Sequence, residues 1–90
     1  MKIKRMCYLV SGRVQGVEFR EKARKKADEI GLFCLAENIP PPDGRVFLEV
    51  TGKWIDIVKI VSWMKLLEGV EKVVSTPEKP ERVSVLPNSK

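Results

Sequence analysis

A ten-residue segment near the start of the chain, residues 11–20, contains Gly12, Gly16 and, in the first turn of an expected helix, Arg20. It follows an apolar run, residues 6–10, that is typical of a buried strand. Backbone N–H groups in a strand-to-helix turn can converge on one point, where the helix N-terminus favours an anion. Arg20 in the first helical turn can grip two oxygens of that anion. The segment therefore indicates a phosphate-binding loop, although the residues alone leave an ordinary solvated turn open as the alternative.

The pattern G-x-V-Q-G-V-x-F-R over residues 12–20 resembles the first signature of the acylphosphatase family. In that family the signature marks the phosphate loop and its arginine. The resemblance implies that Arg20 neutralises the bound phosphoryl group. It also implies that backbone amides hold the phosphoryl oxygens, namely those of Arg13, Val14, Gln15, Gly16 and Val17.

A second signature of the same family ends with an asparagine that positions the attacking water, followed by Gly-x-Val and a later glycine. Asn38, Gly44 and Gly52 match it, and the spacing between the two glycines fits. The loop after Asn38 is two residues longer than the family pattern and carries three consecutive prolines. Glu37 stands where the family has a basic residue, but strand alternation should point it away from the Asn38 face. The resemblance covers roughly residues 5–74.

The residue types also restrict the chemistry. The chain contains no histidine, which excludes a phosphohistidine intermediate, a histidine-activated nucleophile and a histidine-based metal site. Without a general acid the best leaving group is a carboxylate, whose conjugate acid has a pKa of about 4. The amide of Asn38 can orient a water by donating and accepting, although its position alone equally fits an ordinary turn residue. We expect no metal and no cofactor.

The elements that must position these residues follow from periodicity and from the glycines and prolines. Helices are expected at residues 17–30 and 54–67. Strands are expected at residues 5–11, 32–38, 45–51, 70–75 and 82–86. The order βαββαβ with a short extra C-terminal strand predicts a ferredoxin-like α+β sandwich, with two helices packed on one face of an antiparallel sheet. Residues 1–90 are expected to form a single domain.

The second expected helix is apolar at ten of its fourteen positions, more than one buried stripe needs. The stripe expected on the sheet combines Trp54 or Val58 with Ile57, Val61 and Met64. A second apolar side would then hold Ile60, Trp63 and Leu67. We expect a monomer in which the C-terminal tail covers that side, with weak self-association through the helix as the alternative.

Composition and charge restrict the partners. The net charge of +5 is expected to lie mostly on a solvated helix face, where it attracts a phosphorylated small molecule. No nucleic-acid or membrane partner is expected, and the absence of a signal-like segment predicts a cytoplasmic protein. Cys7 and Cys34 could pair, but their apolar surroundings favour reduced core residues. The 32% of charged residues and the few amides hint at a thermophile.

By resemblance, we expect an enzyme that hydrolyses small-molecule acyl phosphates with water as nucleophile, and that inorganic phosphate inhibits as the product. One alternative is a catalytically impaired anion-binding relative, suggested by Glu37 and the long proline loop. The other is an RNA-binding module, since the RNA-recognition fold has the same element order. That function needs several aromatics on the central strands, whereas these strands offer only Tyr8 and Phe47.

Overall fold

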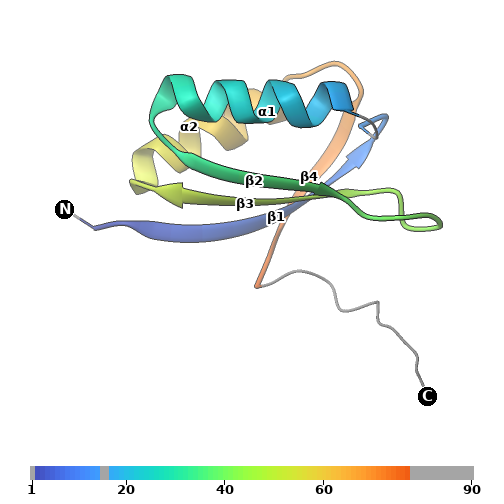
Figure 1. The fold of residues 1–90 in the computed structure, drawn as a ribbon, viewed down its shortest axis with the longest axis horizontal. Coiled ribbons are helices and arrows are strands. Elements are labelled where there is room, and N and C mark those ends of the chain that lie inside the picture. The colour runs from blue at the N-terminus through green and yellow to red at the C-terminus, as the bar shows by residue number, and fades with distance from the viewer. Residues whose placement is uncertain (1, 15–16, 78–90) are drawn as a thin grey trace.

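Four antiparallel strands form one sheet, and two helices lie across one of its faces (Figure 1). The computed structural model describes residues 2–14 and 17–77. The strand order is β2-β3-β1-β4, with β1 and β3 in the centre. In chain order the elements are β1 (Lys4–Gly12), α1 (Val17–Ile30), β2 (Phe33–Asn38), β3 (Val46–Gly52), α2 (Trp54–Lys65) and β4 (Val70–Thr76). This arrangement confirms the ferredoxin-like α+β fold predicted from the sequence.

The predicted boundaries are close to the observed ones. Both ends of α1 agree, each strand within the described residues agrees to within one residue at either end, and α2 ends two residues early. Helix α1 ends where Gly31 adopts a φ of 102°, because the N–H groups of Gly31 and Leu32 both bond the carbonyl oxygen of Ala27 at 2.8 Å. The strand expected at residues 82–86 lies outside the described part of the chain.

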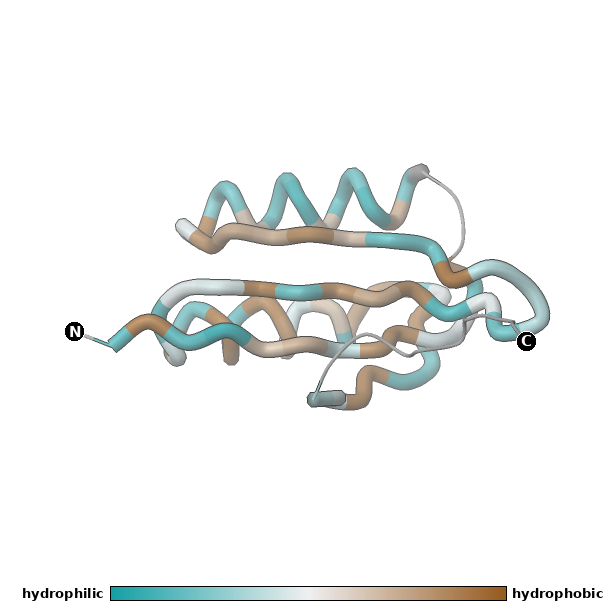
Figure 2. The backbone as a smooth tube through the Cα atoms, turned by 60° about the horizontal axis from the view of Figure 1, so that its bottom comes forward, coloured by the Kyte–Doolittle hydropathy of each residue, from teal (hydrophilic) through white to brown (hydrophobic). Residues whose placement is uncertain are grey.

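Side-chain alternation along the strands divides the apolar residues between two faces of the sheet. The larger core lies between the sheet and the helices, and the fully buried Ala23 and Ala27 of α1 belong to it. The outer side of α1 is hydrophilic (Figure 2). On the opposite face a smaller buried cluster consists of Cys7, Leu9, Ile39 and Phe47.

The distribution of side chains over the two faces tests the RNA-binding alternative and the possible pairing of the two cysteines. Tyr8 lies in the core on the helix side and Phe47 is only 5% exposed, so the central strands offer no aromatic platform for bases. The RNA-binding alternative therefore has no support. Cys7 and Cys34 belong to clusters on opposite faces, and within the described chain neither forms a disulfide.

The predicted buried face of α2 was wrong in part. Ile57, Ile60 and Met64 are fully buried, while Trp63 and Leu67 are half-buried against the core. The spacing i, i+3, i+4, i+7 of residues 57, 60, 61 and 64 defines the stripe on the sheet. Trp54 and Val58, expected there, are exposed instead, together with Ile55 and Leu66.

The helices also contact each other directly, because Lys26 Nζ of α1 lies 5.5 Å from the centroid of the Trp63 ring of α2. A Trp63→Glu substitution would therefore disturb both this contact and the packing of Trp63 against the core. Neither helix is long and apolar enough to cross a membrane among the residues that the structure describes.

We predict that Gly12→Ala destabilises the fold more than Gly31→Ala. Both glycines have positive φ, which costs about 1–2 kcal/mol for alanine. Only at Gly12 would a Cβ run into the carbonyl oxygen of Gly69 and lie 2.8 Å from the Glu71 nitrogen, which adds about 1–3 kcal/mol. Urea unfolding of both variants measures the difference, and equal losses would contradict the close approach of β1 to the Gly69 turn.

Candidate active site

The predicted anion loop is held at its start by backbone and core contacts. It leaves β1 at Gly12, and the Arg13 N–H donates to the carbonyl oxygen of Gly69 at 2.8 Å. Val14 is 1% exposed and packs in the main core. Gln15 and Gly16, two of the predicted phosphate ligands, lie outside the described residues. The loop therefore starts from a fixed point between β1 and the turn that precedes β4.

The loop ends at the N-terminus of α1, which begins at Val17. The first N–H groups of a helix lack partners within the helix, and the macrodipole adds partial positive charge there. Arg20 lies in this first turn and is half-buried. A helix N-terminus and a guanidinium group within one turn can together stabilise a bound anion.

Asn38 reaches the same end of the sheet from a different strand. It is the last residue of β2 and pairs with Val46, which in turn pairs with Val10 near the end of β1. Within the described structure, its side-chain oxygen Oδ1 is buried and has no hydrogen-bond partner. Such an oxygen is costly to leave unsatisfied, so it is suited to accept a hydrogen bond from a bound molecule.

Glu37 lies on the other side of β2, as strand alternation predicts. It pairs with Phe47, which belongs to the cluster on the face away from the helices. Ala36, by contrast, belongs to the core on the helix side, so Asn38 points toward that side as well. The acidic residue therefore does not share the face of Asn38.

The proline-rich loop after Asn38 is closed tightly despite its extra length. The Ile39 N–H donates to the carbonyl oxygen of Arg45 at 2.8 Å, and the Ile39 side chain is 3% exposed. Asp43 Oδ1 accepts from the backbone N–H of Arg45 at 3.0 Å and from its Nε at 2.7 Å. Asp43 Oδ2 accepts from Nη2 at 2.7 Å, and these side-chain bonds raise the pKa of Arg45. These contacts hold the residue that follows Asn38 in one place.

Nucleophilic and metal chemistry have little basis in the described residues. Burial raises the pKa of Cys34 to about 11. The positive charge of Arg24 opposes this rise in pKa, and the negative charge of Asp28 adds to it. The thiol therefore stays protonated near neutral pH and is a poor nucleophile. Among the residues that the structure describes, no three His, Cys, Asp or Glu side chains gather closely enough to hold a metal ion.

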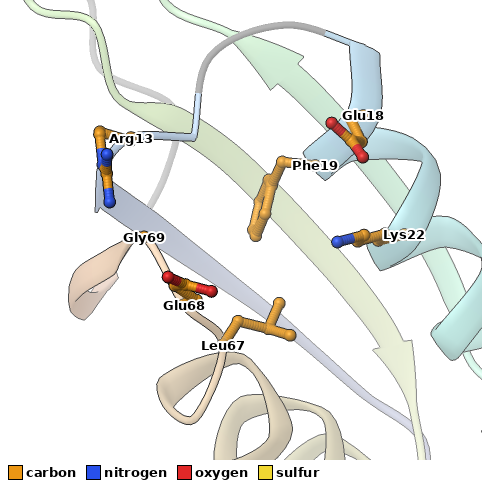
Figure 3. Close-up of a pocket in the computed structure, with 7 residues that line it drawn as sticks. All are labelled: Arg13, Glu18, Phe19, Lys22, Leu67, Glu68 and Gly69. Carbon is orange, nitrogen blue, oxygen red and sulfur yellow. The ribbon is translucent and has the colours of Figure 1, made fainter.

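A pocket of about 450 Å³ opens beside the anion loop, between the first turns of α1 and the turn after α2 (Figure 3). Its lining residues are Arg13, Glu18, Phe19, Lys22, Leu67, Glu68 and Gly69. Sequence reasoning missed this pocket, because its two walls lie about fifty positions apart. The hydrogen bond from Arg13 to Gly69 brings them together, and no sequence motif signals such a contact.

These features define a class of protein: a small α+β sandwich in which a helix N-terminus and an arginine within its first turn follow the end of the first strand. Comparison with known proteins gives the family. The family profile described as Acylphosphatase matches residues 6–83. The chain belongs to the acylphosphatase family, which places it among the hydrolases that act on acyl phosphates.

Individual relatives agree with this assignment. The chain is 41% identical over 63 residues to an acylphosphatase of Methylococcus capsulatus, an alignment that covers 70% of this chain and 66% of that protein. It is 39% identical to one of Marinobacter nauticus, covering 82% of this chain and 76% of the relative. The crystal structure of an acylphosphatase from Bacillus subtilis superposes with a TM-score of 0.71 at 27% identity, covering 90% and 91% of the two chains. The family resemblance inferred from the two signatures is thus confirmed.

We predict that Asp43→Ala loosens the loop without unfolding the protein. Losing the bidentate contact should speed hydrogen exchange at the Ile39 amide about tenfold, which corresponds to ~1.4 kcal/mol of local opening. Global stability should fall by less than about 1 kcal/mol, because the pair is partly exposed.

NMR-detected exchange measures the local effect and thermal melting the global one. Glu21→Ala is the matched control, because it removes an exposed carboxylate that lies 3.5 Å from Arg24 on α1, away from this loop. Unchanged exchange at Ile39 in the Asp43 variant would show that the loop is held by other contacts.

Proposed function

We propose that this chain hydrolyses acyl phosphates to a carboxylate and inorganic phosphate, with water as the nucleophile. The observation that carries the proposal is the meeting of two features at one end of the sheet. One is the loop that ends at the α1 N-terminus, and the other is Asn38 with its buried, unpartnered oxygen. Membership of the acylphosphatase family supports the same reaction.

In this proposal the loop binds the phosphoryl group. Backbone amides from Val14 to Val17 hold its oxygens, and Arg20 neutralises their charge, with Gln15 and Gly16 outside the described residues. The Arg13 amide, expected from the resemblance to take part, is left out of the proposal because its one N–H already donates to Gly69. Phosphoryl transfer has a loose transition state, so positioned charge supplies most of the catalysis. A loop whose start is fixed by the bond to Gly69 and by Val14 in the core is suited to that task.

Asn38 orients the water. Its Oδ1 accepts a hydrogen bond from the water, whose oxygen attacks phosphorus in line with the departing acyl oxygen. The bond between phosphorus and that oxygen breaks, the carboxylate leaves with the electron pair, and the water proton passes to phosphate or solvent. The leaving carboxylate needs no protonation, which fits a chain without histidine. The proposal includes no metal and no cofactor.

The alternative of an impaired, merely anion-binding relative rests on Glu37 and the longer loop. Glu37 faces away from Asn38, and the loop is closed by its own hydrogen bonds, so neither feature obstructs catalysis. Hydrolysis of benzoyl phosphate by the purified protein distinguishes an active enzyme from a binder. The single domain, the monomeric state, the cytoplasmic location and the thermophile hint stay predictions from the sequence.

We predict that Arg20→Ala abolishes most activity and weakens inhibition by inorganic phosphate. Removing a charge that grips the anion should cost about 2–5 kcal/mol of phosphate binding, with more lost in the transition state. Arg20→Lys should recover part of the phosphate binding, because lysine keeps the positive charge but lacks the parallel N–H donors of the guanidinium group. Arg24→Ala, one turn further along α1, is the control. Wild-type turnover and phosphate inhibition in the alanine variant would rule out this assignment of the loop.

We predict that Asn38→Ala lowers kcat about a hundredfold while the inhibition constant of phosphate hardly changes, because the amide holds the water and not the anion. Steady-state kinetics with benzoyl phosphate, with phosphate as competitor, measures both quantities. Glu37→Gln is the neighbouring control on the other face and should change neither. Equal losses of turnover and phosphate binding would instead assign Asn38 to the phosphoryl group.

A further inference from the structure

The pocket beside the anion loop is lined by residues from both ends of that loop. Arg13 lies at its start, and Glu18 follows Val17 at its end. The opposite wall comes from Leu67 and Glu68 in the turn before β4 (Figure 3). The pocket therefore adjoins both described ends of the loop, next to a phosphoryl group held there.

The sheet order places the pocket and Asn38 on opposite sides of the point where the loop leaves β1. The loop leaves β1, which lies between β3 and β4. Asn38 approaches from β2, beyond β3, whereas the Leu67–Gly69 wall leads into β4 on the other side. In-line displacement needs the water and the leaving group on opposite sides of phosphorus. With the water beside Asn38, the leaving carboxylate and its acyl group fall on the side of the pocket.

The lining combines a small apolar surface with charges of both signs. Phe19 and Leu67 supply the apolar part, and Lys22 extends toward the middle from α1 as Glu68 does from the other wall (Figure 3). The charged groups are Arg13, Glu18, Lys22 and Glu68, two of each sign. In the part of the chain that the structure describes, none of the four side chains makes an ion pair or a hydrogen bond.

We propose, building on the function above, that this pocket binds the acyl group and prefers one that carries both an ammonium and a carboxylate. The acyl phosphate of an amino dicarboxylic acid has this chemistry. Its ammonium faces Glu18 and Glu68, its carboxylate faces Arg13 and Lys22, and its methylene groups contact the apolar part. A plain alkyl group gains only the apolar contact, and the four exposed charges keep their hydration instead of pairing with the ligand.

The size of the pocket agrees with such a group. Small-molecule sites usually span about 300–1,000 Å³. The 450 Å³ here admits an amino-acid head of a few heavy atoms together with water. The four charges are two of each sign, so a head group of one sign alone gains less from them than one that carries both.

Stable phosphonates test the proposal without relying on turnover. 2-Amino-5-phosphonopentanoate places three atoms between its phosphorus and its α-carbon, as a β-aspartyl phosphate does. Pentylphosphonate lacks both charges of the head, and 5-phosphonopentanoate lacks only the ammonium. Calorimetry should give a Kd at least about tenfold lower for the zwitterionic compound than for pentylphosphonate, with 5-phosphonopentanoate between them.

Two substitutions locate the effect. Glu68→Gln and Glu18→Gln should each reduce the tenfold preference by at least half while the Kd of inorganic phosphate stays unchanged. Glu29→Gln, at the far end of α1, is the matched control and should preserve the preference. Circular dichroism checks that each variant folds, and the two pocket variants are independent should one of them fail to fold.

The outcomes separate this inference from the proposed function. Equal affinity for all three phosphonates in a protein that hydrolyses benzoyl phosphate would overturn the inference and leave the function standing. Absence of hydrolysis would overturn the function, while calorimetry would still decide the preference of the pocket. Parallel loss of phosphate binding in the Glu68 and Glu18 variants would also overturn the inference, because it would place these carboxylates in the phosphate site.

Discussion

The backbone hydrogen bond between Arg13 and Gly69 is the contact on which the candidate site depends. It joins the end of β1 to the turn before β4, where the chain at Gly12 passes too close to Gly69 for any Cβ. Three things follow from this one junction: the start of the anion loop is fixed, β4 is brought alongside β1, and the pocket gains its second wall. This junction is a main-chain interaction, so most side-chain substitutions leave it in place, whereas Arg13→Pro would remove its donor N–H.

Sheet register supplies the other half of the site. Asn38 lies on the edge strand β2. Its pairing with Val46 of β3, which pairs with Val10 of β1, brings it next to the end of β1, where the loop begins. The helix N-terminus and the asparagine amide therefore belong to elements that meet through the sheet and not through local sequence. In the proposed mechanism the groups for charge stabilisation and for water orientation come from separate elements, α1 with its loop and β2, and neither role requires a histidine.

Local features and the fold class could be predicted from the sequence, whereas side-chain packing and contacts between distant segments could not. The strand-to-helix loop and α1 were predicted because glycine positions, an apolar stripe and a terminating Gly31 all lie within twenty-odd consecutive residues. The buried face of α2 was partly misassigned because ten apolar residues in fourteen leave the period ambiguous, and packing against the sheet selects Ile60 over Trp54. The pocket was missed since Leu67 and Glu68 reach the loop only through folding. The roles of Arg20 and Asn38 rest on the resemblance and stay predictions.

The closure of the loop after Asn38 has a consequence for how this protein can vary. A main-chain hydrogen bond joins Ile39 to Arg45, and the Asp43 carboxylate binds the Arg45 side chain. The positions of the two ends of this loop are therefore fixed independently of the number of residues between them. Insertions or deletions at its tip would leave the neighbouring asparagine where it is. Length polymorphism among homologues should therefore accumulate at this tip, and a foreign peptide epitope grafted there would be displayed on the surface while the enzyme remained intact.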